Sequence, residues 1–156
     1  MTTADEPSAR KLTGQCLCGG IRFEITAPFR PVIMCHCRQC AQWTGHAVAA
    51  TAVATEHFRL TAGEDLLGWY RASGVATRGF CRTCGSSLFW KPDDGSRISI
   101  LAGSLDPPTG LAVESHIHVG AKSDYFSLCD DVPKYDGGSA PMGVPPGSPA
   151  LSGEGT

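Results

Sequence analysis

The chain carries, at residues 35–40, the stretch CHCRQC, in which three cysteines lie within six residues. Two further cysteine groups flank it, GQCLCGG at residues 14–20 and FCRTCGS at residues 80–86. The three groups hold seven of the eight cysteines, and only Cys129 stands alone. Residues two apart in an extended strand point to the same side, and a C-x-x-C turn also brings two sulfurs together. All three groups therefore have the spacing of metal-ligating cysteines, for which zinc is the typical ion.

The number of clustered cysteines predicts two different zinc sites in each chain. Cysteines two apart make poor disulfide partners, because the ring they would close is too small for relaxed torsions. Two pairs complete one closed, structural four-sulfur site, formed by Cys16, Cys18, Cys81 and Cys84. The remaining three give a second zinc three protein ligands and an open position, as in catalytic zinc sites, and these are Cys35, Cys37 and Cys40.

A side chain from elsewhere in the chain could close the second site and make it structural too. The candidates for a fourth ligand are His36, His46, His116, His118 and Cys129. His36 lies between two of the ligands, so on a strand it would point to the opposite face. Three thiolates leave a zinc site with a net negative charge, which Arg38 and Arg82, beside the cysteine groups, could offset.

Length and composition predict one globular domain. The chain has 156 residues, of which 42% are hydrophobic and 18% charged, with a formal net charge of −2. This balance argues against a surface that binds nucleic acid or an anionic membrane. No apolar run reaches the ~18 residues that span a bilayer, and the N-terminus has no secretory pattern. We therefore expect a cytoplasmic protein.

The pattern along the chain predicts a mainly β fold. Ile21, Phe23 and Ile25 alternate with polar residues, residues 46–54 form a small apolar run, and residues 38–43 could form one short helical turn. Toward the C-terminus one strand is expected, with Val113, Ile117 and Val119 on one face and Glu114, His116 and His118 on the other. We expect a flexible N-terminus at 1–11, a zinc-binding β domain at 12–135, and a disordered tail rich in Gly, Pro and Ser at 136–156.

Five stretches resemble the glutathione-dependent formaldehyde-activating enzyme family, whose domain is shared by centromere protein V-type proteins. They are GQCLCGGIRFEI, CHCRQCAQWTGHAVAA, TRGFCRTCGSSLFW, ILAGSLDP and KSDYFSLCDDVPKY. The resemblance covers about residues 12–135 and implies a β-tent of short antiparallel sheets stapled by zinc. It also implies the same division of cysteines, four structural and three catalytic. The chain departs from the family at Tyr125, where members often carry tryptophan.

The resemblance implies a carbon–sulfur lyase that condenses formaldehyde with glutathione to S-hydroxymethylglutathione. A small thiol and a small aldehyde are then the expected partners, with the thiol taking the open position at Cys35, Cys37 and Cys40. Trp43, which closely follows these cysteines, and Ser104, at a predicted strand end, are the candidate substrate-binding residues. Two alternatives remain: an interaction scaffold in which both zincs are structural, and a redox or metal sensor that uses the exposed thiolates.

Overall fold

The computed structural model of the chain describes residues 9–138. Most of the predicted flexible N-terminus, 1–11, and of the predicted tail, 136–156, lies outside the described residues. Within the described part strands dominate, and α1 (Arg38–Thr44) is the one α-helix, at the place where a short helical turn is predicted. The prediction of a mainly β fold with little helix is therefore confirmed. No helix among these residues is long and apolar enough to cross a membrane.

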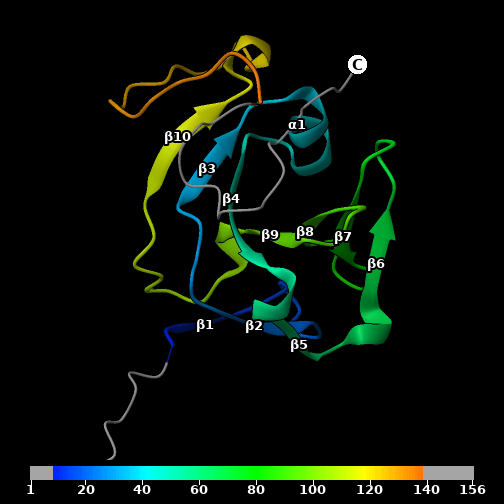
Figure 1. Cartoon of the computed structure of the whole chain (residues 1–156). Coiled ribbons are helices and arrows are strands. Elements are labelled where there is room, and N and C mark those ends of the chain that lie inside the picture. The colour runs from blue at the N-terminus through cyan, green and yellow to red at the C-terminus, as the bar shows by residue number, and fades with distance from the viewer. Residues whose placement is uncertain (1–8, 139–156) are drawn as a thin grey trace, which may run out of the picture.

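The strands form two sheets (Figure 1). The small sheet has the order β1-β2-β5 and consists of β1 (Lys11–Gln15), β2 (Arg22–Thr26) and β5 (Phe58–Ala62). The large sheet has the order β10-β3-β4-β9-β8-β7-β6 and consists of β3 (Val32–Cys35), β4 (Val48–Ala54), β6 (Leu67–Tyr70), β7 (Ala76–Cys81), β8 (Ser87–Pro92), β9 (Arg97–Leu101) and β10 (Val113–Ile117). Neighbouring strands are antiparallel, except that β10 runs parallel to β3.

Short 3-10 turns connect several strands, and they are η1 (Thr55–His57), η2 (Glu64–Leu66), η3 (Ala102–Ser104) and η4 (Val119–Ala121). Figure 1 shows the small sheet at one end of the molecule and α1 at the other, above β3 and β4. The large sheet runs between these two ends, so one of its faces can pack on the small sheet while the other is available to α1.

The hydrophobic core lies between the small sheet and one face of the large sheet. On β2 the predicted alternation is confirmed, because Phe23 and Ile25 are buried while Arg22 is exposed. The ring of Phe23 packs edge-on against Phe89 of β8, with ring centroids 5.0 Å apart. Burying one such side chain stabilises the fold by about 1.5–3 kcal/mol. The buried core residues are Leu12, Cys16, Ile21, Phe23, Ile25, Val53, Cys81, Leu88, Phe89, Ile98, Ile100 and Leu105.

The other face of the large sheet is also buried, and it carries polar side chains. On β9, Ile98 and Ile100 belong to the core, whereas the alternating residues Arg97 and Ser99 point to the opposite face and are only 3% and 5% exposed. Ser99 pairs with Trp90 of β8, and Trp90 pairs with Arg78 of β7, so one row of side chains crosses three strands on this face. This second face of the large sheet forms one wall of the candidate functional site.

The strand β10 departs from the predicted pattern. A register shift between Val113 and Ser115 breaks the alternation, so that Val113 is 38% exposed while Ser115, His116 and Ile117 are all buried. The predicted strand face ends at Ile117, because His118 adopts a left-handed conformation with φ of 55° and the chain continues into η4. The prediction that His116 and His118 lie on the same face of one strand is therefore wrong. Residues 133–135 cover the outer edge of β10, where the Tyr135 N–H donates to the His116 carbonyl at 2.9 Å.

We predict that Gly63→Ala destabilises the protein far more than Gly95→Ala. Both glycines have a positive φ, 83° and 66°, so alanine is strained at either position. A Cβ at residue 63 would in addition overlap the carbonyl oxygen of Gly20, whereas nothing lies within 4 Å of a Cβ at residue 95. The free energy of unfolding, measured by urea denaturation, should fall by about 1 kcal/mol for Gly95→Ala and about 3 kcal/mol or more for Gly63→Ala. Equal losses would contradict the close approach of the two backbones.

Candidate functional site

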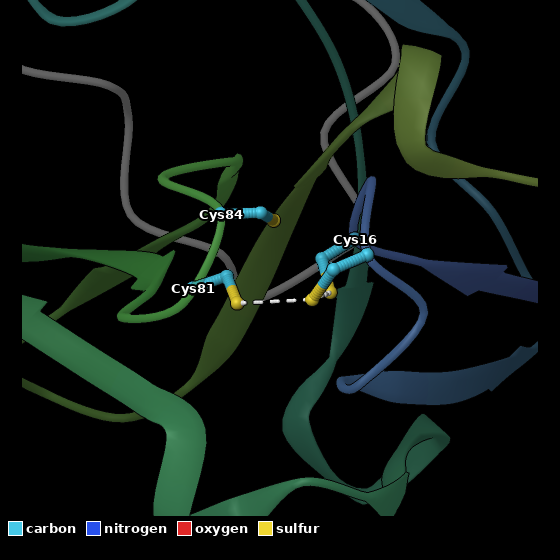
Figure 2. A group of neighbouring side chains, drawn as sticks. Cys16, Cys81 and Cys84 are labelled. Atoms are coloured by element: carbon cyan, nitrogen blue, oxygen red, sulfur yellow. Dashed lines mark hydrogen bonds between the residues drawn. The ribbon is translucent and has the colours of Figure 1, made fainter.

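The first cysteine cluster joins two turns that lie far apart in the sequence. Cys16 and Cys18 follow β1, while Cys81 ends β7 and Cys84 lies in the turn that leads to β8. Their four sulfurs lie within 4.8 Å of one another. Figure 2 shows Cys16 on one segment and Cys81 and Cys84 on the other, with side chains turned toward a common centre. The structure thus brings together the four cysteines predicted as one set.

The sulfur–sulfur distances fit a metal cage and not a disulfide. The Sγ atoms of Cys16 and Cys18 are 3.5 Å apart, and those of Cys18 and Cys81 are 3.8 Å apart. A disulfide requires about 2.05 Å. In a tetrahedral zinc–thiolate site with Zn–S bonds of ~2.3 Å, two sulfurs are separated by ~3.8 Å. The cluster could therefore hold one metal ion with four sulfur ligands.

Backbone hydrogen bonds shape the turn that carries Cys16. The N–H of Ile21 donates to the Cys16 sulfur at 3.2 Å, and the N–H of Cys16 donates to the Ile21 carbonyl at 3.1 Å. The turn between them needs a left-handed residue, which Gly19 supplies with φ of 75°. N–H donation stabilises negative charge on a sulfur, as a thiolate ligand requires.

The second turn contributes to the cluster in the same way. The hydroxyl of Ser86 lies 3.2 Å from the Cys84 sulfur and also accepts a hydrogen bond from the Leu17 N–H at 2.9 Å, so it ties the two turns together. Hydrogen bonds from the Ser86 hydroxyl and from the N–H groups of Ser86 and Cys18 lower the pKa of Cys84 to about 5. The Cys84 sulfur is therefore prepared for ionisation, whereas hydrogen bonding to Cys16 raises the pKa of Cys18 to about 11.

The second cluster is built locally, at the junction of β3 and α1. Cys35 is the last residue of β3, Cys37 is the N-cap of α1, and Cys40 lies in its first turn. The Cys40 N–H donates to the Cys37 sulfur at 3.3 Å, so a sulfur fills the capping role that an oxygen usually has. The Cys40 and Cys35 sulfurs are 3.6 Å apart, and all three sulfurs lie within 4.8 Å of one another. This triplet could also hold a metal ion.

The surroundings of the triplet favour ionisation of Cys37 and disfavour ionisation of Cys35 and Cys40. Hydrogen bonds from Cys35 and Cys40 lower the pKa of Cys37 to about 2. The pKa of Cys35 is raised by its hydrogen bonds to Cys37 and Cys40 and by burial. A single thiolate is thus stable here without help, but ionising all three thiols requires a cation among them.

No other cysteine, histidine or carboxylate of residues 9–138 joins the triplet at ligand distance. His36 points away, and its Nε2 lies 2.8 Å from Nδ1 of His116, whose Nε2 is 2.7 Å from Asp130. His46 is hydrogen bonded at 2.6 Å to the hydroxyl of Tyr125. The remaining candidates are Cys129, which is exposed, and His118, which borders the same cavity as the triplet.

A cavity of about 870 Å³ opens beside the triplet. All three triplet cysteines line it, and α1 and the polar face of the large sheet form its walls. Trp43, predicted from its closeness to the triplet, lies in this lining. Ser104 does not; it borders a shallower hollow beside Cys16, and its hydroxyl donates to the Leu101 carbonyl at 2.7 Å.

Arg78 is the basic residue that contacts the triplet, and the sequence analysis missed it. One guanidinium nitrogen, Nη1, donates to the Cys40 sulfur at 3.8 Å, and Nη2 donates to Oε1 of Gln39 at 3.1 Å. The guanidinium carbon lies 5.0 Å from the centre of the Trp43 ring, a cation–π contact.

The sequence analysis expected two other arginines to offset the negative charge of the thiolates. Of these, Arg38 lines the cavity and Arg82 is exposed on the turn of the other cluster. The feature of the sequence that could have indicated Arg78 is the one arginine in the strand ATRGFC.

Three comparisons place the chain among known proteins. An uncharacterized lyase of Schizosaccharomyces pombe is 29% identical over 82 residues, which are 53% of this chain and 58% of that protein. A crystal structure of a Rhodobacter sphaeroides protein superposes with a TM-score of 0.51 at 23% identity, covering 61% of this chain and 88% of the other, and this likeness shows the fold. The sequence profile of the glutathione-dependent formaldehyde-activating enzymes matches residues 11–121, which include all seven clustered cysteines. The chain therefore belongs to the glutathione-dependent formaldehyde-activating enzyme family.

Proposed function

We propose that this protein is a zinc-dependent carbon–sulfur lyase that makes or breaks the adduct of a formaldehyde-like aldehyde with a thiol such as glutathione. The observation that carries the proposal is the cysteine triplet, whose three sulfurs face a cavity of about 870 Å³ without a fourth ligand from residues 9–138. Family membership supports the lyase chemistry. The site belongs to the single domain proposed for residues 12–135, and the free thiols fit a reducing compartment such as the cytoplasm.

We assign different roles to the two clusters. Cys16, Cys18, Cys81 and Cys84 would hold a structural zinc, because four sulfurs leave no position for a substrate. Cys35, Cys37 and Cys40 would hold the working zinc, which when bound would supply an open coordination position that lowers the pKa of an added thiol. In the addition a bond forms between sulfur and the carbonyl carbon while the carbonyl π bond breaks toward oxygen. The oxygen takes a proton from water, and the proton that the thiol loses passes to water, so the thiol and the aldehyde give the adduct with no other product.

The residues around the triplet prepare the cavity for this chemistry. Arg78 donates to the Cys40 sulfur, which reduces the excess negative charge of three thiolates and limits repulsion of an incoming fourth. Trp43 and apolar side chains from β3, β4 and β10, namely Ile33, Val48 and Ile117, line part of the cavity and give it an apolar wall beside the triplet.

The number of bound zinc ions and the rate of their release should distinguish the two clusters. We expect two zinc ions per chain by mass spectrometry of the purified protein, and rapid loss of one to a chelator because the triplet opens to the cavity. Cys37→Ser should retain the slowly released zinc alone. Cys81→Ser should lose that slow zinc and more than ~4 kcal/mol of unfolding free energy, since Cys81 is fully buried where the two turns meet. Release of both ions at one rate would contradict the division into closed and open sites.

The catalytic role of the triplet is tested by exchange kinetics. Two-dimensional exchange NMR measures how fast formaldehyde hydrate and S-hydroxymethylglutathione interconvert. The wild-type protein should accelerate this exchange, and Cys37→Ser should return it to the uncatalysed rate. Cys129→Ser is the matched control, because Cys129 is exposed and lies outside both clusters, and it should leave the rate unchanged. No acceleration by zinc-loaded wild-type protein would favour the scaffold alternative over the enzyme.

A further inference from the structure

A chain of three hydrogen-bonded side chains starts at His36, between two of the triplet cysteines, and the proposed chemistry does not use it. Nε2 of His36 lies 2.8 Å from Nδ1 of His116, and Nε2 of His116 lies 2.7 Å from Oδ2 of Asp130. The two histidines are 2% and 4% exposed, whereas Asp130 is exposed. Neither histidine lines the cavity beside the triplet, so the chain needs an explanation other than contact with substrate.

The chemistry of the three groups determines which atoms carry protons. The carboxylate of Asp130 can only accept, so Nε2 of His116 donates to it. In the neutral ring of His116 the other nitrogen, Nδ1, is then the acceptor, and Nε2 of His36 donates to it. Nδ1 of His36 is left without a proton, which agrees with its burial without a hydrogen-bond partner among residues 9–138, because an N–H there would be an unsatisfied donor. Asp130 therefore fixes the orientation of both rings.

The backbone of His36 is attached to the same strand as its side chain. The His36 N–H donates to the Ile117 carbonyl at 3.0 Å, and Ile117 follows His116 on β10. Ring and backbone of His36 are thus bonded to two successive residues of β10. The residue that separates Cys35 from Cys37 therefore has little freedom to rotate.

The far end of the chain is held by the segment that follows η4. The Lys134 ammonium donates to Oδ1 of Asp130 at 3.1 Å and to the Asp130 carbonyl at 2.6 Å. The hydrogen bond from His116, followed by that from Lys134, keeps the pKa of Asp130 below its usual value, so the acceptor is ionised at neutral pH. From the same segment the Phe126 ring stacks on His36, with ring centroids 5.8 Å apart.

We propose that Asp130 is a positioning residue for the metal-binding triplet, acting through His116 and His36 on the directions of the neighbouring cysteine sulfurs. Because Cys35 and Cys37 flank His36, rotation of this residue would turn both sulfurs away from a shared tetrahedral centre. This role rests on the proposed function, since it takes the triplet as the site of the working zinc. Asp130 lies beyond the part of the chain that the family profile matches, so its support is additional to the cysteine motif.

Zinc release from the two clusters of one protein measures this role without an enzyme assay. Asp130→Ala removes the acceptor that orients His116, and it should speed the fast phase of zinc release to a chelator by ~10-fold, as for other residues that orient metal ligands. The slow phase, from the four-cysteine cluster, should not change. General destabilisation would speed both phases, so equal acceleration would overturn the proposal, as would an unchanged fast phase.

Two further variants separate the hydrogen bond from the loss of charge. Asp131→Ala is the matched control, because Asp131 is the exposed neighbour with the same charge and its side chain forms no hydrogen bond or ion pair with a described residue; it should release zinc as the wild type does. Asp130→Asn keeps an oxygen that can accept from His116 and should restore most of the slower rate. Release from Asp130→Asn as fast as from Asp130→Ala would contradict a role for this hydrogen bond.

A double-mutant comparison tests whether Asp130 acts through His36. His36→Phe keeps a ring that can stack on Phe126 but has no nitrogen to join the hydrogen-bonded chain. In this background Asp130→Ala should no longer speed the fast phase. An undiminished effect of Asp130→Ala would overturn the route through His36.

The result is separable from the outcome for lyase activity. If wild-type protein fails to accelerate adduct exchange but Asp130→Ala speeds the fast phase alone, the positioning role stands and the lyase proposal fails. If the exchange is accelerated and Asp130→Ala leaves the fast phase unchanged, the lyase proposal stands and the positioning role fails. A wild-type chain that binds one zinc only would overturn both, because the triplet would then hold no metal.

Discussion

The meeting of two cysteine turns is the constraint on which this fold depends. The sulfurs of Cys18 and Cys81 lie 3.8 Å apart although 63 positions separate them in the sequence. Closing so long a loop costs conformational entropy that a small sheet of three short strands offsets only in part. A metal ion shared by the four sulfurs would add its binding energy to folding where the small sheet meets the large one. The cluster lies where the turn after β1 meets the turn between β7 and β8, so it joins the two sheets at this point.

The large sheet serves two purposes because both of its faces are buried. Along β9, Ile98 and Ile100 pack in the core, and the alternating residues Arg97, Ser99 and Leu101 line the cavity. A strand with one solvated face would show ordinary hydrophobic–polar alternation, and its polar residues would need no explanation. Here the polar residues are Arg97 and Ser99, both nearly inaccessible to solvent. The guanidinium carbon of Arg97 lies 5.5 Å from the centre of the Trp90 ring, so neighbouring side chains of this polar row pack against one another.

The sequence predicted the features that depend on residues close together in the chain. It did not predict those that depend on how the strands pair with one another. The triplet and the pairing of the two cysteine turns followed from spacing and counting, because thiols at these intervals have few other uses. The short helix at 38–44 and the alternation on β2 also followed from local pattern. Arg30, Arg78 and Arg97 lie on or beside three different strands, and what they face is set by pairings between strands that no short motif reports. Strand alternation predicted that His36 points away from the triplet, but its partner there, His116, is 80 positions away and no local pattern indicated it.

The triplet and the rest of the cavity lining depend on the sequence in different ways. The triplet lies within six residues of chain, so its geometry depends on one strand end and one helix start. The remaining lining comes from β4, β7, β8, β9 and β10, which are far apart in the sequence and are brought together by strand pairing. Side chains of this lining can therefore change without disturbing the cysteines, so the motif constrains the triplet more closely than it constrains the cavity around it.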